Sequence, residues 1–548
     1  MKRAMLEKDH WYKAGVWYAL DVETFQDSDG DGVGDFQGLI SRLDYLATLG
    51  VTCIWLLPFY PSPGLDNGYD VMDYYNVDKR LGSLGDFTAF VREAKERGMR
   101  VLIDLVVNHT SREHPWFQEA RKDKNSKYYK YYIWRKEKPE DSHAEPMFGG
   151  EEDDIWSYDE EAKEYYLHRF YSHQPDLEIT NPEVHKEIFN IMGFWLALGV
   201  AGFRVDAAHI LVQDDNNESA EHFYKLLEDM RSYINTHSTD AILLAEATGP
   251  PEMIGNFFKE ETRMHMAFNF LMNQHLFHAM AIQEAEPLKK GFGLLPDKPE
   301  ACTWLNFLRH HDELTLVDLK QNEIEETFAA FAPEENMQIF GHGIRRRLAP
   351  MLGNNRQQLE LCYSLMFSLP GTPLIQYGAE IGMGDDLSLP GRISVRTPMQ
   401  WSSVQKNGGF STAPADKLVR PVISGGPYGF EEVSVRDQQN DSFSLLNWIE
   451  RLIRIRRQCH EIGRGRWEII EVGHKSVLVH SCILHSTTVF FHNLSDTPCS
   501  FTVPSPLNEA EEVTEYLSDQ SYSRPDANDK ILELGPYGYR WFRIGHTK

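Results

Sequence analysis

The sequence predicts an α/β fold: a (β/α)8 barrel with an inserted subdomain after the third strand and a C-terminal antiparallel β domain. Three observations predict it. From Trp11 onward, short apolar runs alternate with amphipathic segments. One long charged and aromatic stretch interrupts the alternation, and after about residue 461 strand-like segments follow one another without helices between them.

The barrel strands are predicted where a short apolar run, typical of a strand buried on both faces, stands between turn signals. These runs are Val16–Leu20, Cys53–Leu57, Val101–Val107, Phe203–Val205, Ile242–Ala245, Trp304–Leu308 and Leu374–Tyr377. The sixth strand is the hardest to place, and we assign it to Met266–Phe270. Helical periodicity fills the intervals at Gly38–Leu49, Phe87–Arg97, Pro182–Leu198, Ala220–Ile234 and Arg356–Ser368.

The interval between the third and fourth strands is far longer than an ordinary βα connection. We therefore predict a barrel made of residues 1–108 and 175–460, with a lid subdomain at 109–174 inserted over its mouth. Period-2 alternation at 476–482, 487–492, 499–503 and 540–544 predicts a β-sandwich domain at 461–548.

Charge and composition limit the classes of partner. The chain has 82 acidic and 55 basic residues, a net charge of −27, which opposes binding to nucleic acid or anionic membranes and favours a neutral substrate or a cation. No run approaches the ~18 apolar residues of a membrane span, and the first residues lack the apolar core of a signal peptide. The six cysteines show no metal-binding spacing, so we predict a cytoplasmic enzyme.

Three predicted strands end in a carboxylate, at Asp206, Glu246 and Asp312. Carboxyl ends of parallel strands carry the catalytic groups of barrel enzymes. A retaining glycosidase needs an ionised carboxylate as nucleophile and a protonated one as acid, roughly 5 Å apart. Arg204 would keep Asp206 ionised, and the apolar strand before Glu246 would raise the pKa of that carboxyl. A structural salt bridge explains any one of these acids, but not all three together.

A candidate metal loop follows the first strand. Carboxylates alternate with glycines, and this pattern suits Ca²⁺, which prefers several hard oxygen ligands including a backbone carbonyl. The predicted ligands are Asp27, Asp29, Asp31, the carbonyl of Val33, and Asp35. The loop differs from an EF-hand because Gly38 stands where the twelfth-position glutamate would be. The alternative is an acidic turn that binds no metal.

Four segments together resemble the α-amylase superfamily, glycoside hydrolase family 13: Asp104–His109, Gly202–Asp206, Glu246 and His311–Asp312. The resemblance implies a TIM barrel with Asp206 as nucleophile, Glu246 as acid/base and Asp312 as transition-state stabiliser. It also implies that His109, Arg204 and His311 contact the glucose that is transferred. Tyr69 would stack on that glucose, and Asp70, paired with Arg396, would close the pocket behind it.

Other implied features concern ions and assembly. The resemblance implies a structural Ca²⁺ or Mg²⁺ in the loop at 27–35, and a second cation held by Asn108 and Asp176. No organic cofactor is expected. Family members often form homodimers, and nothing in the sequence requires or opposes one.

Within the superfamily, residues 55–63, 168–177, 307–316 and 343–350 look most similar to trehalose synthases, and add Phe170 and Gln174 to the expected substrate-binding residues. Such an enzyme would isomerise maltose to trehalose through a covalent β-glucosyl-Asp206, with some hydrolysis. His310 departs from the family's usual asparagine, as do the residues after Asp206. A hydrolytic exo-α-glucosidase or a transglucosidase for another small α-glucoside therefore stays open, as does, more remotely, a non-catalytic binding module.

Overall fold

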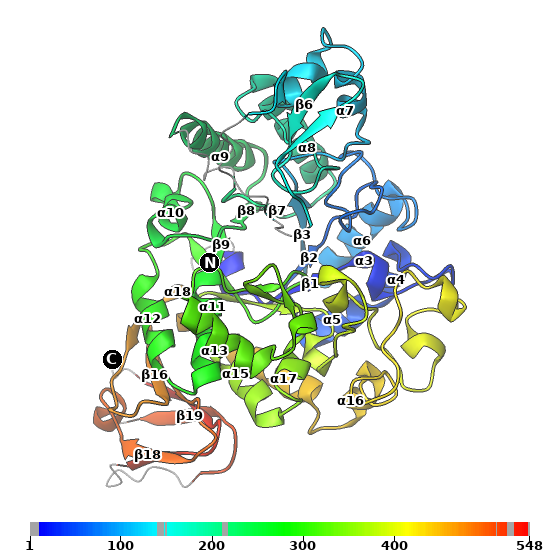
Figure 1. The fold of residues 1–548 in the computed structure, drawn as a ribbon. Coiled ribbons are helices and arrows are strands. Elements are labelled where there is room, and N and C mark those ends of the chain that lie inside the picture. Colours follow the sequence, from blue (N-terminus) through cyan, green and yellow to red (C-terminus); the bar gives the residue numbers. More distant parts are fainter. Residues whose placement is uncertain are drawn as a thin grey trace.

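Eight parallel strands close into a barrel in the order β1-β14-β10-β9-β8-β7-β3-β2 (Figure 1). The computed structural model describes residues 10–139, 147, 151–210, 217–510, 512–522 and 531–545. The barrel strands are β1 (Trp17–Leu20), β2 (Cys53–Leu56), β3 (Arg100–Leu105), β7 (Gly202–Val205), β8 (Ile242–Ala245), β9 (Met266–Phe268), β10 (Thr303–Phe307) and β14 (Thr372–Gln376). The predicted barrel is confirmed, and so is the placement of its sixth strand at β9.

Large side chains fill the interior of the barrel. Trp17, Trp55, Phe268 and Phe307 belong to one buried cluster inside it. Trp11, on the short helix α2 (Trp11–Ala14), stacks on Trp17 with ring centroids 6.0 Å apart. The barrel is therefore a packed core that leaves a site only at its mouth.

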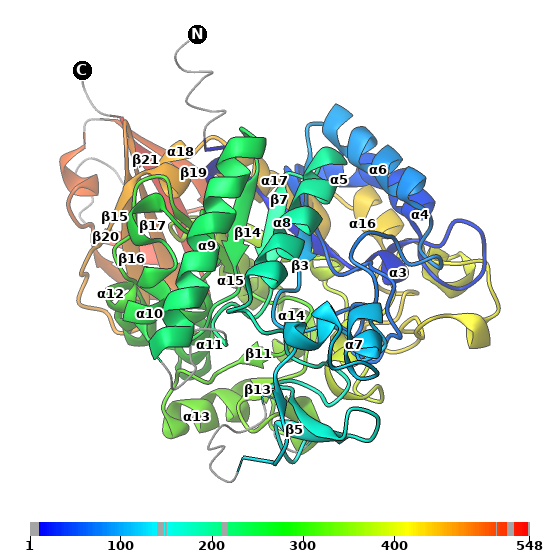
Figure 2. The same cartoon turned by 90° about the horizontal axis from the view of Figure 1, so that it is seen from above.

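Helices surround the strands, and Figure 2 shows α8 and α9 side by side outside β7. The main ones are α8 (Pro182–Ala197), α9 (Asn217–His237), α11 (Phe270–Ile282), α12 (Glu286–Leu294), α13 (Gln321–Phe331), α15 (Arg356–Ser368) and α17 (Leu445–Arg456). The helix predicted at 38–49 is two, α4 (Phe36–Ser41) and α5 (Leu43–Leu49). Helix α6 (Leu84–Glu96) begins before the predicted Phe87 because Ser83 and Asp86 form a capping box.

A small subdomain lies between β3 and β7. Helix α7 (Pro115–Ala120) packs beside an antiparallel sheet of β4 (Trp134–Arg135), β6 (Glu164–Leu167) and β5 (Trp156–Asp159). Isolated bridges His109–Asp176 and Tyr132–Leu177 join this lid to the ends of the barrel strands. The sheet falls inside the predicted lid at 109–174, of which 140–146 and 148–150 lie outside the described residues.

The C-terminal segment forms antiparallel sheets, as predicted. A five-stranded sheet has the order β15-β16-β17-β21-β19, and β18 pairs with β20. Their bounds are β15 (Arg466–Ile469), β16 (Val477–Ile483), β17 (Thr487–Asn493), β18 (Cys499–Thr502), β19 (Val513–Ser518), β20 (Ile531–Leu534) and β21 (Tyr539–Ile544). Figure 1 places this domain at the opposite end of the molecule from the lid.

The C-terminal sheet docks on α15 through polar groups that are fully buried. His480 Nε2 lies 3.1 Å from the carbonyl of Ser368, and His492 Nε2 lies 2.9 Å from Ser364 Oγ. Burial lowers the pKa of His480 to about 4, so this ring is neutral at pH 7. Among the described helices, none combines the length and apolarity that crossing a membrane requires.

Candidate active site

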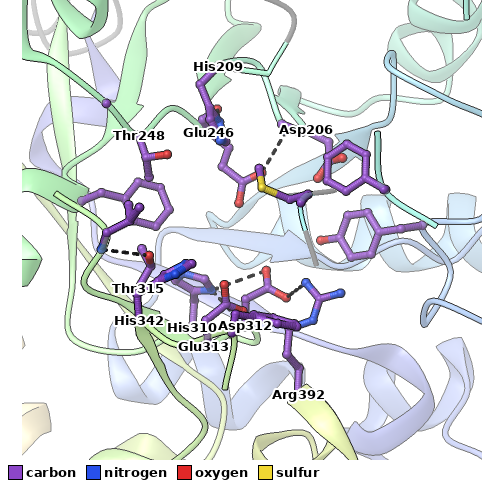
Figure 3. Close-up of a pocket in the computed structure, with 18 of the residues that line it drawn as sticks. Asp206, His209, Glu246, Thr248, His310, Asp312, Glu313, Thr315, His342 and Arg392 are labelled. Carbon is purple, nitrogen blue, oxygen red and sulfur yellow. Dashed lines mark hydrogen bonds and ion pairs between the residues drawn. The ribbon is translucent and has the colours of Figure 1, made fainter. Parts of the chain in front are cut away.

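A cavity of about 350 Å³ opens at the carboxyl ends of the barrel strands. Asp206, Glu246 and Asp312 all line it, and they follow β7, β8 and β10 respectively. Figure 3 shows Asp206 and Glu246 on one side of the cavity and Asp312 on the other. The strand ends thus bring the three predicted acids to one site, as the barrel topology requires.

Arg204 holds two of these acids side by side. Its Nη1 donates to Asp104 Oδ1 and to Asp206 Oδ1, each at 2.6 Å. Its Nη2 lies 2.7 Å from Glu246 Oε1. Asp104 is directly opposite Arg204 in the register of β3 and β7, which fixes the guanidinium in place. The backbone N–H of Ala207 donates to Glu246 Oε2 at 2.9 Å and orients that carboxyl further.

Burial and neighbouring charges act in opposite directions on the pKa of Asp206. Burial raises the pKa of Asp206 well above its usual range, Arg204 opposes this, and Glu246 and Asp104 add to it. Arg204 therefore favours the ionised form of Asp206 against the effect of burial, as predicted in direction. One guanidinium thus faces three carboxylates: Asp104 and Asp206 are buried, and Glu246 is partly exposed.

Asp312 has the opposite electrostatic environment. His311 Nε2 lies 2.9 Å from its Oδ2, while Arg392 and Arg396 lie 2.8 and 2.7 Å from its Oδ1. Burial alone would raise the pKa of Asp312, but His311, Arg392 and Arg396 outweigh it and hold the pKa well below its usual range. Asp312 is a fixed negative charge, suited to accept sugar hydroxyls and to balance positive charge at a reacting carbon.

One end of the cavity is closed by Asp66 and Arg392, not by the predicted pair Asp70 and Arg396. Arg392 Nη2 lies 3.0 Å from Asp66 Oδ1, and both residues line the cavity. Asp70 instead accepts three hydrogen bonds from its own loop, and Arg396 donates to the carbonyl of His311 and to Asp312. The predicted Asp70–Arg396 pair is wrong, because the turn between residues 62 and 70 directs Asp70 inward on itself.

The remaining predicted substrate residues lie around this end. Tyr69, His109 and Phe170 line the cavity. Tyr69 stacks on His311 with ring centroids 5.7 Å apart, and burial lowers the pKa of His109 to about 3, so that ring is neutral. Gln174 does not line the cavity; it donates to Asp66 Oδ2 at 2.9 Å and supports that carboxylate from behind.

The other side of the cavity is formed by residues that the sequence did not single out. They are Thr248, Gly249, Pro250, Phe270, Thr315, Val317, Phe340 and His342. Thr248, Gly249 and Pro250 follow β8, Phe270 begins α11 after β9, and the other four lie in the long segment between β10 and β14. Their position after strand ends was the only signal that could have found them, because no motif marks single positions in such loops. The residues at 211–216, after Asp206, lie outside the described part of the chain.

The acidic loop after β1 brings three of its predicted ligands together. Carboxylate oxygens of Asp27, Asp29 and Asp35 lie within 4.8 Å of one another. Asp31 is not part of that group, and its Oδ1 accepts from the N–H of Val33 at 2.8 Å. Three converging carboxylates on a glycine-rich turn fit a hard divalent cation such as Ca²⁺ or Mg²⁺.

The predicted second cation would lie between Asn108 and Asp176. Arg169 Nη1 lies 2.8 Å from Asp176 Oδ2, and Asn108 Nδ2 donates to Asp176 Oδ1 at 3.1 Å. A guanidinium and an amide N–H already bind both carboxylate oxygens. Asp176 therefore has a protein cation as its partner, while the buried Asn108 Oδ1 has no hydrogen-bond partner among the described residues, and a second cation stays a prediction.

Comparison with known proteins agrees with this geometry. A family model described as the α-amylase catalytic domain matches residues 22–465. A trehalose synthase from Pimelobacter sp. (strain R48) is 37% identical over 554 residues, covering 98% of this chain and 96% of that protein. A trehalose synthase/amylase from Mycobacterium tuberculosis (strain ATCC 25618 / H37Rv) is 37% identical over 544 residues, covering 97% and 90%. The crystal structure of an α-amylase from H. orenii superposes with a TM-score of 0.78 at 28% identity, covering 97% and 99%.

Proposed function

The chain belongs to the α-amylase family, and from that premise we propose that it isomerises maltose to trehalose and hydrolyses a minor part of it. Two relatives that match nearly the whole chain are named trehalose synthases. The observation that carries the proposal is the placement of Asp206 and Glu246 on neighbouring nitrogens of Arg204, beside a cavity closed at one end by Asp66 and Arg392.

In the first step, the non-reducing glucose of maltose lies between Asp206 and the Asp66–Arg392 pair. Asp206 Oδ attacks C1 of this glucose as Glu246 gives its proton to the glycosidic oxygen, and the C1–O4 bond breaks. In this step Asp206 reacts as the carboxylate and Glu246 as the carboxylic acid. Asp312, with its low pKa, balances the positive charge that develops on the sugar ring.

In the second step, the released glucose turns within the cavity and presents its anomeric hydroxyl. Glu246, now ionised, takes the proton of that hydroxyl. The O1 oxygen of the released glucose then attacks C1 of the glucosyl-enzyme and forms the 1→1 bond. Asp206 leaves as a carboxylate. If water takes the place of O1, the product is a second glucose, so isomerisation depends on keeping water out.

A hydrolytic exo-α-glucosidase is the second candidate. The closed end at Asp66 and Arg392 serves either reaction, since it only receives a terminal glucose. What favours hydrolysis is the departure of this chain from the family pattern at His310 and after Asp206, where the released glucose must be retained. The difference lies in the fate of the glucosyl-enzyme, not in how it forms.

We further propose that Asp27, Asp29 and Asp35 hold a Ca²⁺ or Mg²⁺, with Asp31 and the carbonyl of Val33 completing the ligands. The convergence of three carboxylates supports this. Bound there, the ion would stabilise the loop between α3 (Val22–Phe25) and α4.

Product analysis tests the main proposal. The enzyme is incubated with maltose, and trehalose and glucose are separated by chromatography over time. Trehalose as the main product with minor glucose supports isomerisation. Glucose alone would make the protein a hydrolase, and no reaction with maltose would move the search to other α-glucosides.

A further inference from the structure

His310 is a buried polar residue of the cavity wall that the reaction above does not use. Its side chain is 3% exposed and lines the cavity directly after β10. Figure 3 shows it beside Asp312, across the cavity from Asp206 and Glu246. Its three nearest rings are those of Phe307, His311 and Phe270, with centroids 4.9, 5.4 and 5.8 Å away.

The hydrogen bonds of His310 fix its tautomer. The backbone N–H of Asp312 donates to His310 Nδ1 at 3.0 Å, so Nδ1 carries no proton. Burial lowers the pKa of His310 well below its usual range, so the ring is neutral. The single ring proton is therefore on Nε2, and His310 presents an N–H donor there.

That donor has no partner among the residues the structure describes. A buried N–H without an acceptor is destabilising, because it has lost its hydrogen bond to water and gained none in the protein, so native proteins rarely keep one. Phe270 and Phe307 offer no oxygen or nitrogen to accept it. The group that can accept it is one that enters the cavity.

The order of the barrel strands indicates which part of the substrate that group belongs to. The glucose to be transferred lies by Tyr69, His109 and Asp206, after β2, β3 and β7. Glu246, after β8, must stand beside the glycosidic oxygen to protonate it. The leaving glucose therefore lies beyond Glu246, toward the loops after β9 and β10, where Phe270 and His310 form the wall.

We propose that His310 Nε2–H donates to a hydroxyl of the leaving glucose and so positions it for the second step. The inference rests on the proposed function, because it names how the acceptor sugar of that reaction is held. His310 is a positioning residue in this account: it touches the acceptor, while bond making and breaking stay with Asp206 and Glu246. A sugar without a hydroxyl at that point would lose the contact.

Two substitutions distinguish the loss of the Nε2–H hydrogen-bond donor from the loss of the volume of the imidazole ring. In His310→Asn the amide oxygen can replace Nδ1 as acceptor for the N–H of Asp312, but nothing reaches the position of Nε2. In His310→Gln the amide N–H group reaches that position. The readout is the ratio of kcat/KM for maltose to kcat/KM for p-nitrophenyl α-D-glucoside, whose leaving group has no sugar hydroxyls.

We expect His310→Asn to lower this ratio by about five-fold, the effect of one neutral hydrogen bond, and to lower the trehalose fraction formed from maltose. His310→Gln restores both toward the wild-type values. An unchanged ratio in His310→Asn, or an equal fall in both variants, would overturn the assignment. If the wild-type enzyme forms no trehalose, the proposed isomerisation fails, yet the ratio still tests His310, because hydrolysis of maltose uses the same leaving glucose.

Discussion

The pairing of Asp66 with Arg392 predicts that Asp66, and not Asp70, determines how tightly a terminal glucose binds. The change to make is Asp66→Asn, which keeps the shape of the side chain and removes its charge. Arg392 retains Asp312 as a partner at 2.8 Å, so no guanidinium is left uncompensated. The free energy of unfolding should therefore change little, and the effect should fall on the substrate.

The size of the effect follows from the lost carboxylate. A hydrogen bond from a sugar hydroxyl to a charged acceptor contributes about 1.5–3 kcal/mol, so kcat/KM for maltose should fall by about 10- to 150-fold. Steady-state kinetics on maltose measures it, with a thermal melt as the check on folding. Unchanged kinetics in Asp66→Asn would refute the closed-end geometry.

Asp70→Asn is the matched control. Asp70 is fully buried and accepts hydrogen bonds from Ser62 and from the amides of Leu65 and Asp66. Its substitution should lower the melting temperature by loosening that loop, with a smaller loss of kcat/KM than in Asp66→Asn at a temperature where both variants are folded. A larger loss of kcat/KM in Asp70→Asn than in Asp66→Asn would support the Asp70–Arg396 pair expected from the sequence.

Three further predictions concern the nucleophile, the metal loop and the C-terminal sheet. Asp206→Asn should lower kcat by at least about 10⁴-fold without lowering the melting temperature, since the amide keeps the shape of the carboxyl and removes a charge that burial disfavours; retained turnover would exclude Asp206 as nucleophile. Asp29→Asn, or a chelator, should lower the melting temperature and the bound Ca²⁺ or Mg²⁺ measured by elemental analysis; a protein that contains no metal and melts unchanged would contradict the site. His480 has a folded pKa of about 4 against an ordinary 6.5, so the unfolded chain binds its proton first and stability falls as the pH drops from 6.5 to 4. Over that window the stability advantage of the wild type over His480→Gln, from urea unfolding, should shrink by about 3 kcal/mol, and a constant difference would count against it.

The sequence was sufficient to predict the site residues whose position depends only on a single barrel strand and the residue that follows it. Asp206, Glu246 and Asp312 each follow an apolar run, and barrel topology alone requires such residues to meet. The sequence was not sufficient where the packing of loops far apart in the chain determines which of two similar residues faces the cavity. Two aspartates, Asp66 and Asp70, stand four positions apart, and which of them faces the cavity is decided by a turn that no periodicity reveals.

The sequence also did not show that several carboxylates contact the same guanidinium. The proximity of Arg204 to Asp206 on one strand suggested an ion pair between these two residues alone. In the structure, β3 and β8 also bring Asp104 and Glu246 to the guanidinium of Arg204. Likewise, no pattern in the sequence showed that Arg169, seven residues before Asp176, pairs with that carboxylate. In both cases the electrostatics depends on neighbours that only tertiary structure supplies.

The closure of the barrel has a consequence for how the chain is made. β1 lies between β2 and β14, and Trp17 pairs with Leu374. One edge of β1 therefore has no hydrogen-bond partner in the barrel until β14 has been synthesised. Roughly 350 residues separate the two strands. At about 5–20 residues per second, a ribosome needs roughly 20 to 70 s to deliver β14 after β1. Throughout that interval the nascent chain carries an open strand edge, which makes it a substrate for chaperones and a site of aggregation during overproduction.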